Sequence, residues 1–243
     1  MTHARYRRLA PPAIVALGVM LTGCDGGDVE INGQKGVPLA EIEIAGPPPS
    51  EIVVASSDTV IITEGNIFAI KVEGADTDSL RFVRDSEVIA VTRENGWSGA
   101  GSAIIRVTMP APKTIVMGGS GTVEFGRVAA QKLGINIGGS GTVKGAGTPK
   151  ELEILIGGSG KIVMPQLEAD KAEVSIGGSG DVAFASDGTV EATIGGAGDV
   201  NVTGNAKCTL QSFGSGALNC TPTSGGTSGA SAAIPAPAGK PAQ

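Results

Sequence analysis

Between Lys113 and Cys220, apolar and polar residues alternate on both sides of a short glycine-rich tetrad that recurs six times. If the first residue of a tetrad is position zero, positions −5, −3, −1 and +5 are apolar in most repeats. Around residues 157–160 these positions hold Leu152, Ile154, Ile156 and Ile162. Alternation with a period of two is typical of strands with one buried face. Each repeat is therefore predicted to be a strand, a tight turn, a second strand and a loop.

The tetrads begin at residues 118, 138, 157, 177, 195 and 213, so the repeat length is 18–20 residues. A fixed period of this size predicts an all-β solenoid. Its stacked rungs place like positions about 4.8 Å apart around one apolar core. The glycines are expected to adopt positive φ angles and to let neighbouring backbones approach closely. The predicted turn residues are Gly118, Gly119, Ser120, Gly121, Gly138, Gly139, Ser140, Gly141, Gly157, Gly158, Ser159, Gly160, Gly177, Gly178, Ser179, Gly180, Gly195, Gly196 and Gly198, followed by a variant tetrad at residues 213–216.

Positions −5 and +7 are equally far from the turn, so they are predicted to face each other inside the solenoid. Leu133 then faces Gly145, and a large residue is expected to compensate for a small one. In the last repeat the same positions hold Cys208 and Cys220. In an exported protein this predicts a disulfide that closes the open end and contributes about 2–3 kcal/mol. Two buried thiols are the alternative.

Short apolar runs bounded by Gly, Asn, Asp or Ser extend the β pattern towards the N-terminus. Strands are predicted at residues 52–54, 60–62, 68–72, 80–83, 88–91 and 103–108, with a further strand at 41–45. Trp97 lies in a glycine-rich loop between two of these runs. It is a candidate binding anchor, the alternative being a ring folded back over the end of the core.

The first residues have the pattern of an export signal. Arg5, Arg7 and Arg8 precede a mostly apolar run, residues 9–21, that is too short to cross a bilayer as a helix. Residues 21–24, Leu-Thr-Gly-Cys, resemble the lipobox of bacterial lipoproteins, in which the chain is cut before the cysteine and the cysteine is acylated.

This resemblance implies a signal peptide at residues 1–23 and a lipid, such as palmitate, on Cys24. Residues 24–50 are then a flexible tether behind the membrane anchor. The implied location is the envelope of a Gram-negative bacterium, and the resemblance does not distinguish the inner from the outer membrane. A soluble secreted protein with a chance cysteine is the alternative.

Composition supports many short strands joined by tight turns, because the 243 residues include 39 Gly and 14 Pro but only 3% aromatics. The formal charge of −6 and the lack of a basic stripe argue against nucleic-acid binding. Residues 222–243 are mostly Ala, Gly, Pro, Ser and Thr, which predicts a disordered tail.

Several classes of chemistry are excluded by the sequence. His3 is the single histidine and is lost with the leader, which removes Ser-His-Asp catalysis, Cys-His catalysis and histidine-ligated metals. Residues 157–161 are not a phosphate-binding loop, since Leu155 and Ile162 stand where Gly and Ser or Thr are needed. The tetrads also lack the aspartate that calcium-binding glycine repeats carry. We therefore expect no enzyme activity, no cofactor and no metal site.

Two columns of outward positions carry carboxylates. Position −4 holds Glu153, Glu173 and Glu191, and position +4 holds Lys161, Asp181 and Asp199. Carboxylates stacked about 5 Å apart repel, so a cation, a basic partner or solvent is expected to offset them, and Lys161 is placed to serve Asp181. Both columns are candidate binding residues, although a merely solvated face fits them as well. Asp181 and Asp199 also have roughly the separation of a retaining glycosidase pair.

The repeated tetrad, together with Gly134-Ile135-Asn136, resembles the head GIN domain, a family of bacterial cell-surface or periplasmic domains, over residues 51–221. The resemblance implies a right-handed β-helix and an adhesin-like role, and it brings no catalytic residues. We expect a non-enzymatic envelope lipoprotein that binds a glycan or an envelope protein. A polysaccharide-active enzyme using Asp181 and Asp199 and a purely structural protein are the alternatives. An exposed terminal rung favours a homo-oligomer.

Overall fold

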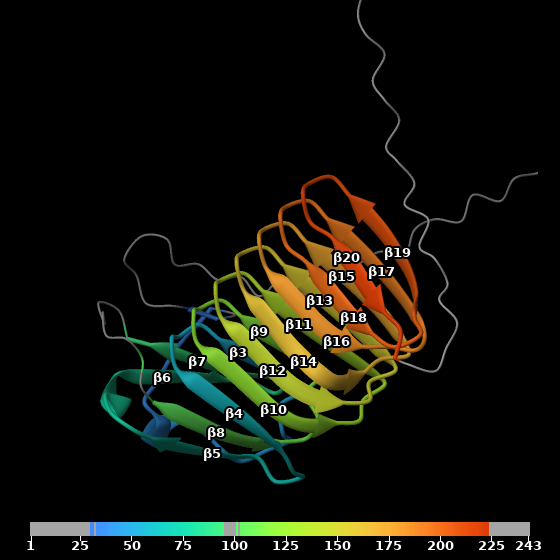
Figure 1. The fold of residues 1–243 in the computed structure, drawn as a ribbon. Helices are drawn as coiled ribbons and strands as arrows, with labels where there is room; N and C mark the ends of the chain where they lie inside the picture. Colours follow the sequence, from blue (N-terminus) through green and yellow to red (C-terminus); the bar gives the residue numbers. More distant parts are fainter. Residues whose placement is uncertain (1–29, 32, 95–100, 102, 224–243) are drawn as a thin grey trace, which may run out of the picture.

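Two facing sheets of stacked strands make up the computed structural model, which describes residues 30–31, 33–94, 101 and 103–223 (Figure 1). The predicted signal peptide, Cys24, Trp97 and most of the predicted tail lie outside these residues. No helix within the described ranges is both long and apolar enough to cross a membrane.

Sheet I has the strand order β19-β17-β15-β13-β11-β9-β3-β7-β6 among the described residues. Its strands are β3 (Glu51–Val54), β6 (Leu80–Arg84), β7 (Val88–Arg93), β9 (Thr114–Met117), β11 (Lys132–Ile137), β13 (Glu151–Ile156), β15 (Lys171–Ile176), β17 (Thr189–Ile194) and β19 (Lys207–Ser212). Within it, all neighbours are parallel except β6 and β7.

Sheet II has the order β20-β18-β16-β14-β12-β10-β4-β8-β5 over the same part of the chain. Its strands are β4 (Thr59–Glu64), β5 (Ala69–Glu73), β8 (Ile104–Met109), β10 (Thr122–Val128), β12 (Thr142–Gly147), β14 (Lys161–Glu168), β16 (Asp181–Ala185), β18 (Val200–Thr203) and β20 (Leu218–Thr221). Each rung gives one strand to each sheet, and from β9 onwards a tetrad lies between the two strands. The predicted β-solenoid and its repeat length are confirmed.

The core is one continuous column of apolar side chains between the sheets. Ile154 and its registered neighbours Ile135 and Val174 are each exposed by 3% or less. A Cβ on Gly145 would lie 2.2 Å from the ring of Phe125 in the adjacent rung. The small Gly145 is therefore matched to the large Phe125 of the neighbouring rung. The sequence predicts a different match, between Gly145 and Leu133 within one rung.

The first rung along the chain is not the first in the stack. β3 and β4 lie between the β7–β8 rung and the β9–β10 rung. The chain thus begins inside the solenoid, turns back to build one end, and then resumes on the other side. β5 and β6 close that end as antiparallel edge strands against β8 and β7. The six strands predicted between residues 52 and 108 are confirmed.

The strand predicted at residues 41–45 is wrong. Leu39–Glu41 is a 3-10 helix, and the carbonyls of Glu43, Ala45 and Pro47 accept hydrogen bonds from Arg84 instead of a strand ladder. Nearby, Val37 forms a bridge with Phe82. The second half of the stretch predicted as a tether therefore packs on the domain. Before it, β1 (Glu30–Ile31) and β2 (Gln34–Lys35) form a short hairpin, and a second 3-10 helix, Thr77–Ser79, precedes β6.

Candidate binding faces

The tetrads form a straight edge where sheet I turns into sheet II. The amide of Ser159 donates to the carbonyl of Gly139 in the preceding rung at 3.1 Å, and the amide of Ser179 donates to that of Gly158 at 3.0 Å. A Cβ on Gly158 would lie 2.1 Å from the Gly139 oxygen. The predicted close backbone approach is confirmed. The predicted positive φ is wrong, because no tetrad glycine adopts it. These glycines leave room for the carbonyl of the next rung.

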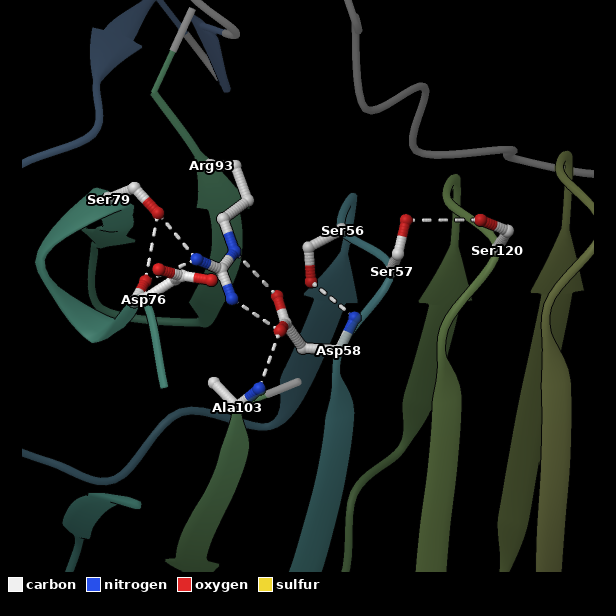
Figure 2. A network of polar contacts seen from close by, with 8 residues as sticks. All are labelled: Ser56, Ser57, Asp58, Asp76, Ser79, Arg93, Ala103 and Ser120. Atoms are coloured by element: carbon white, nitrogen blue, oxygen red, sulfur yellow. Dashed lines mark hydrogen bonds and ion pairs between the residues drawn. The ribbon is translucent and has the colours of Figure 1, made fainter. Parts of the chain in front are cut away.

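Serine hydroxyls lie along this edge. Ser120, Ser140, Ser159 and Ser179 are exposed at the third position of successive tetrads. The series extends one rung towards the closed end, because Ser57 Oγ lies 3.1 Å from Ser120 Oγ (Figure 2).

The predicted glutamate column lies on the outer face of sheet I. Glu153, Glu173 and Glu191 are registered neighbours in β13, β15 and β17, and all three are exposed. Lys132 Nζ lies 2.6 Å from Glu153 Oε1. The flanking column is rich in lysine, and its registered members are Lys132, Glu151, Lys171, Thr189 and Lys207. Lysines beside the column therefore offset part of its charge.

Asp181 and Asp199 lie in neighbouring rungs on the side of sheet II, and each carboxylate has a backbone partner. Asp181 Oδ1 accepts the amide of Asp199 at 3.4 Å, and Asp199 Oδ1 accepts the amide of Ala217 at 3.0 Å. Among the ion pairs of the described residues, none joins Lys161 to Asp181, so the expected cation is replaced by an amide dipole. Both aspartates help to hold successive rungs together.

Side chains of sheet II also pair from rung to rung. Lys144 Nζ lies 3.0 Å from Glu124 Oε1, and Asn219 Nδ2 donates to Asn201 Oδ1 at 3.1 Å. These polar side chains on the outer face of sheet II thus have partners within the sheet. On the outer face of sheet I, Glu173 and Glu191 have no ion-pair partner among the described residues.

A buried polar network at the closed end was missed by the sequence analysis (Figure 2). Arg93 donates through Nε to Asp58 Oδ2 at 2.8 Å and through a second nitrogen to Oδ1. Asp58 Oδ1 also accepts the amide of Ala103 at 3.0 Å. Arg93 further contacts the Asp76 carbonyl and the Ser79 hydroxyl. The network joins β4, β7, β8 and the second 3-10 helix, so its role is structural.

Register explains the position of Asp58. Val54 pairs with Met117 and Thr59 with Thr122, so residues 55–58 replace a glycine tetrad. The sequence could have shown this replacement, because Ser57-x-Thr59-Val60 matches Ser120-x-Thr122-Val123 at the first tetrad.

The structure offers little sign of a catalytic or metal centre in the residues that it describes. It shows no group of three or more His, Cys, Asp or Glu residues placed to hold a metal ion there. A hollow of about 250 Å³ beside sheet II is lined by residues that include Ile61, Glu64, Pro112, Phe125 and Arg127. At the start of β3, burial and the charges of Asp85 and Glu87 raise the pKa of Glu51 above its ordinary value.

The predicted disulfide is confirmed. Cys208 and Cys220 are bonded across the last rung, with their Cα atoms 6.7 Å apart. The bond directly confirms that positions −5 and +7 face each other. Trp97 and Cys24 lie outside the described residues, so their predicted roles stay predictions.

Comparison with known proteins gives one family and several related folds. The profile of the family described as "Putative auto-transporter adhesin, head GIN domain" matches residues 48–206. A crystal structure of a putative adhesin from Bacteroides fragilis superposes with a TM-score of 0.56 at 18% identity, over 71% of this chain and 92% of that one. At this identity the likeness shows the fold alone.

Two further solved structures resemble the chain less closely. A putative lipid binding protein from Parabacteroides distasonis has a TM-score of 0.44 at 18% identity, covering 74% of this chain and 94% of that one. A putative adhesin from Parabacteroides merdae has a TM-score of 0.41 at 14% identity, covering 72% and 92%. A search of curated proteins gave no match.

Proposed function

This chain belongs to the family of putative auto-transporter adhesins with a head GIN domain, and on that premise we propose that it is a non-enzymatic, adhesin-like binding module of the bacterial cell envelope. The observation that carries the proposal is the outer face of sheet I. There, exposed charged and polar side chains form straight columns at the spacing of the rungs.

The geometry of this face suits an extended polar ligand. Strands of six residues, stacked from β11 to β19, present a flat surface of roughly 500 Å². That is less than the ~800 Å² that each partner commonly contributes to a stable interface. One face therefore supports modest affinity, and firm adhesion comes from many copies acting together. A glycan or an envelope protein with repeated polar groups fits such a surface.

Glu173 and Glu191 are the residues we assign to ligand contact. Both are exposed, and no ion-pair partner for them is found in the described part of the chain. Donor groups on a ligand would relieve the repulsion between stacked carboxylates. Trp97 is assigned a second contact, because aromatic rings on loops commonly anchor partners.

The engagement of Asp181 and Asp199 with backbone amides supports a non-enzymatic role. A retaining glycosidase needs one of its two carboxyl groups as a nucleophile and the other as an acid. Here both groups are placed to hold consecutive rungs in register.

The leader supports attachment to a membrane. We assign the lipid to Cys24, which would hold the solenoid at the envelope surface. Replacing Cys24 by Ala is expected to move the protein from the membrane fraction to the soluble fraction. Retention of the variant in membranes would contradict the assignment.

The test of binding uses the full chain against a panel of envelope and extracellular polysaccharides and surface proteins. Retention and newly formed polysaccharide chain ends are scored in the same samples. We expect retention without new ends, and at least about a tenfold loss of affinity in Glu173→Lys/Glu191→Lys, equivalent to about 1.4 kcal/mol. Asn201→Lys/Asn219→Lys introduces two lysines in neighbouring rungs of sheet II; it is the control for the added lysines and should bind normally.

Three outcomes would count against the proposal. New chain ends that disappear in Asp181→Asn, with the fold intact, would establish an enzyme. Equal losses in the two double variants would remove sheet I as the binding face. The absence of retention for every ligand in the panel would favour a structural role.

A further inference from the structure

The two ends of the solenoid differ in how they are finished. At one end, β5 and β6 run antiparallel across the last parallel strands (Figure 1). Phe68, Leu80 and Phe82 are exposed there by only 6%, 1% and 1%. This end is closed in the way that natural sheets protect their edges.

The other end has no such cover among the described residues. β19 and β20 are the terminal strands of the two sheets. Their inward side chains, Leu210, Leu218 and the disulfide cysteines, are partly exposed. In the preceding rung the registered residues are almost fully buried, and they are Val190, Ala192, Val200 and Val202. Phe213, at the turn of the same rung, is 81% exposed.

The backbone of this edge also has amides that point away from the neighbouring strand. The amides of Lys207 and Phe213 donate towards β17, to Gly188 and Ile194. Successive amides of a strand alternate in direction, so Cys208, Leu210 and Ser212 direct their N–H groups away from the stack. Lys207 is the one charged residue on β19 and β20. An edge with one charged residue and apolar inward side chains is a template for further strand pairing.

The composition of residues 224–243 is poorly suited to cover this edge. Residues 224–243 contain Pro235, Pro237 and Pro241 and one large apolar residue, Ile234. Proline lacks the N–H that a strand ladder needs, and a single apolar residue does not supply alternation. A second copy of the chain supplies two edge strands with apolar inward side chains at the same spacing. The Cys208–Cys220 bond fixes that spacing in both copies.

We propose that the end formed by β19 and β20 is the contact surface for a second copy of this chain. The two copies meet end to end about a two-fold axis, and their edge strands pair antiparallel. Both sheets and the apolar column then continue from one copy into the other. The closed ends, with β5 and β6, point away from the junction.

The first test measures mass by sedimentation equilibrium of the full chain, in detergent matched in density to the solvent. Twice the chain mass is expected. Leu210→Lys places a charge on the inward side of the edge and should reduce the mass to that of one chain. In the single copy this lysine can reach solvent at the open end, so the fold is kept. Gln211→Lys adds the same charge on the outward side of the same strand and should leave the dimer intact.

The second test measures hydrogen exchange of the amides of Cys208, Leu210 and Ser212. We expect their protection to rise with protein concentration, in parallel with the mass. A mass of one chain with concentration-independent protection would show that the chain covers its own end and would overturn the proposal. So would a mass of one chain with fast exchange, or equal dissociation by Leu210→Lys and Gln211→Lys.

Discussion

Asp58 and Arg93, 35 residues apart in sequence, form a buried ion pair that joins the two rungs at the closed end of the solenoid. Their side chains are 0% and 6% exposed. The carboxylate also accepts the amide of Ala103, and the guanidinium reaches Asp76 and Ser79 (Figure 2). Both partners of the Asp58 carboxylate, Arg93 and the Ala103 amide, belong to the β7–β8 rung, so the carboxylate holds that rung to β4.

Removing Arg93 should be costly. In Arg93→Met the Asp58 carboxylate stays buried without its main partner, which lowers the free energy of unfolding by about 3–5 kcal/mol. Urea unfolding of the two proteins measures the difference. Arg106→Met is the control, because the Arg106–Glu73 pair is 46% and 57% exposed and should contribute less than about 1 kcal/mol. Equal losses in the two variants would contradict this reading.

Neighbouring glycines of one tetrad should respond differently to alanine. A Cβ on Gly158 meets the carbonyls of Gly139 and Gly138 at 2.1 and 2.6 Å, whereas a Cβ on Gly157 meets nothing within 4 Å. Gly158→Ala is expected to lower stability by about 1–3 kcal/mol, as overpacking does. Gly157→Ala should change it by no more than about 0.5 kcal/mol. Thermal unfolding of both variants decides the point, and similar melting temperatures would refute it.

The same contact explains what the sequence could and could not predict. Glycine is needed at the second and, in most tetrads, the fourth position because the preceding rung directs a carbonyl at it, which gives the visible period from Gly119 onwards. Ser56 and Asp58 stand next to the β7–β8 rung, in which ten residues, 94–103, link the two strands in place of a four-residue tetrad. Residues with side chains take the place of glycine in 55–58, and the repeat becomes hard to see there. Because the rung of Asp58 was not recognised as a repeat, the sequence did not predict the Asp58–Arg93 pair.

The outward carboxylates show a related limit. Alternation placed Glu173, Asp181 and Asp199 correctly on outer positions, since side chains of a strand alternate strictly between faces. It could not show that Asp199 accepts the Ala217 amide, because the direction of a backbone amide at a turn is not encoded in alternation. The Cys208–Cys220 bond was predictable because both residues lie on inward positions equidistant from the turn.

The rung next to the Cys208–Cys220 bond should accept a second disulfide at the registered positions. Val190 and Val202 are the registered neighbours of Cys208 and Cys220, and both are buried. Val190→Cys/Val202→Cys is expected to oxidise to a second intramolecular bond, detected as protection from alkylation before reduction. Ala192→Cys/Val202→Cys is the control, with one cysteine moved two residues along the strand. Alkylation of both variants alike would show that the columns do not face each other.

Glu51 should make stability depend on pH. Its pKa is raised above 4.5, first by burial and then by Asp85 and Glu87. The folded state therefore holds this proton more tightly than the unfolded state does. The stabilisation is fully present below the unfolded pKa and is lost as the pH rises through the folded pKa. Glu51→Gln should raise the melting temperature at pH 7 and have little effect near pH 4.

A control variant separates this effect from general charge removal. Glu191→Gln also removes one negative charge, but from an exposed outer position. Its melting temperature should follow that of the unaltered protein at both pH values. An equal gain at pH 7 in the two variants would assign the effect to net charge.

The insertion of the β3–β4 rung between later rungs limits how such a protein can change length during evolution. Between β9 and β20 each rung contacts only its neighbours, so one repeat of 18–20 residues can be gained or lost by duplication or deletion. The same event among β3–β8 would remove a strand that both flanking rungs require. Homologues of different length should therefore share one end and vary in the number of tetrads, and designed shortening should follow the same rule.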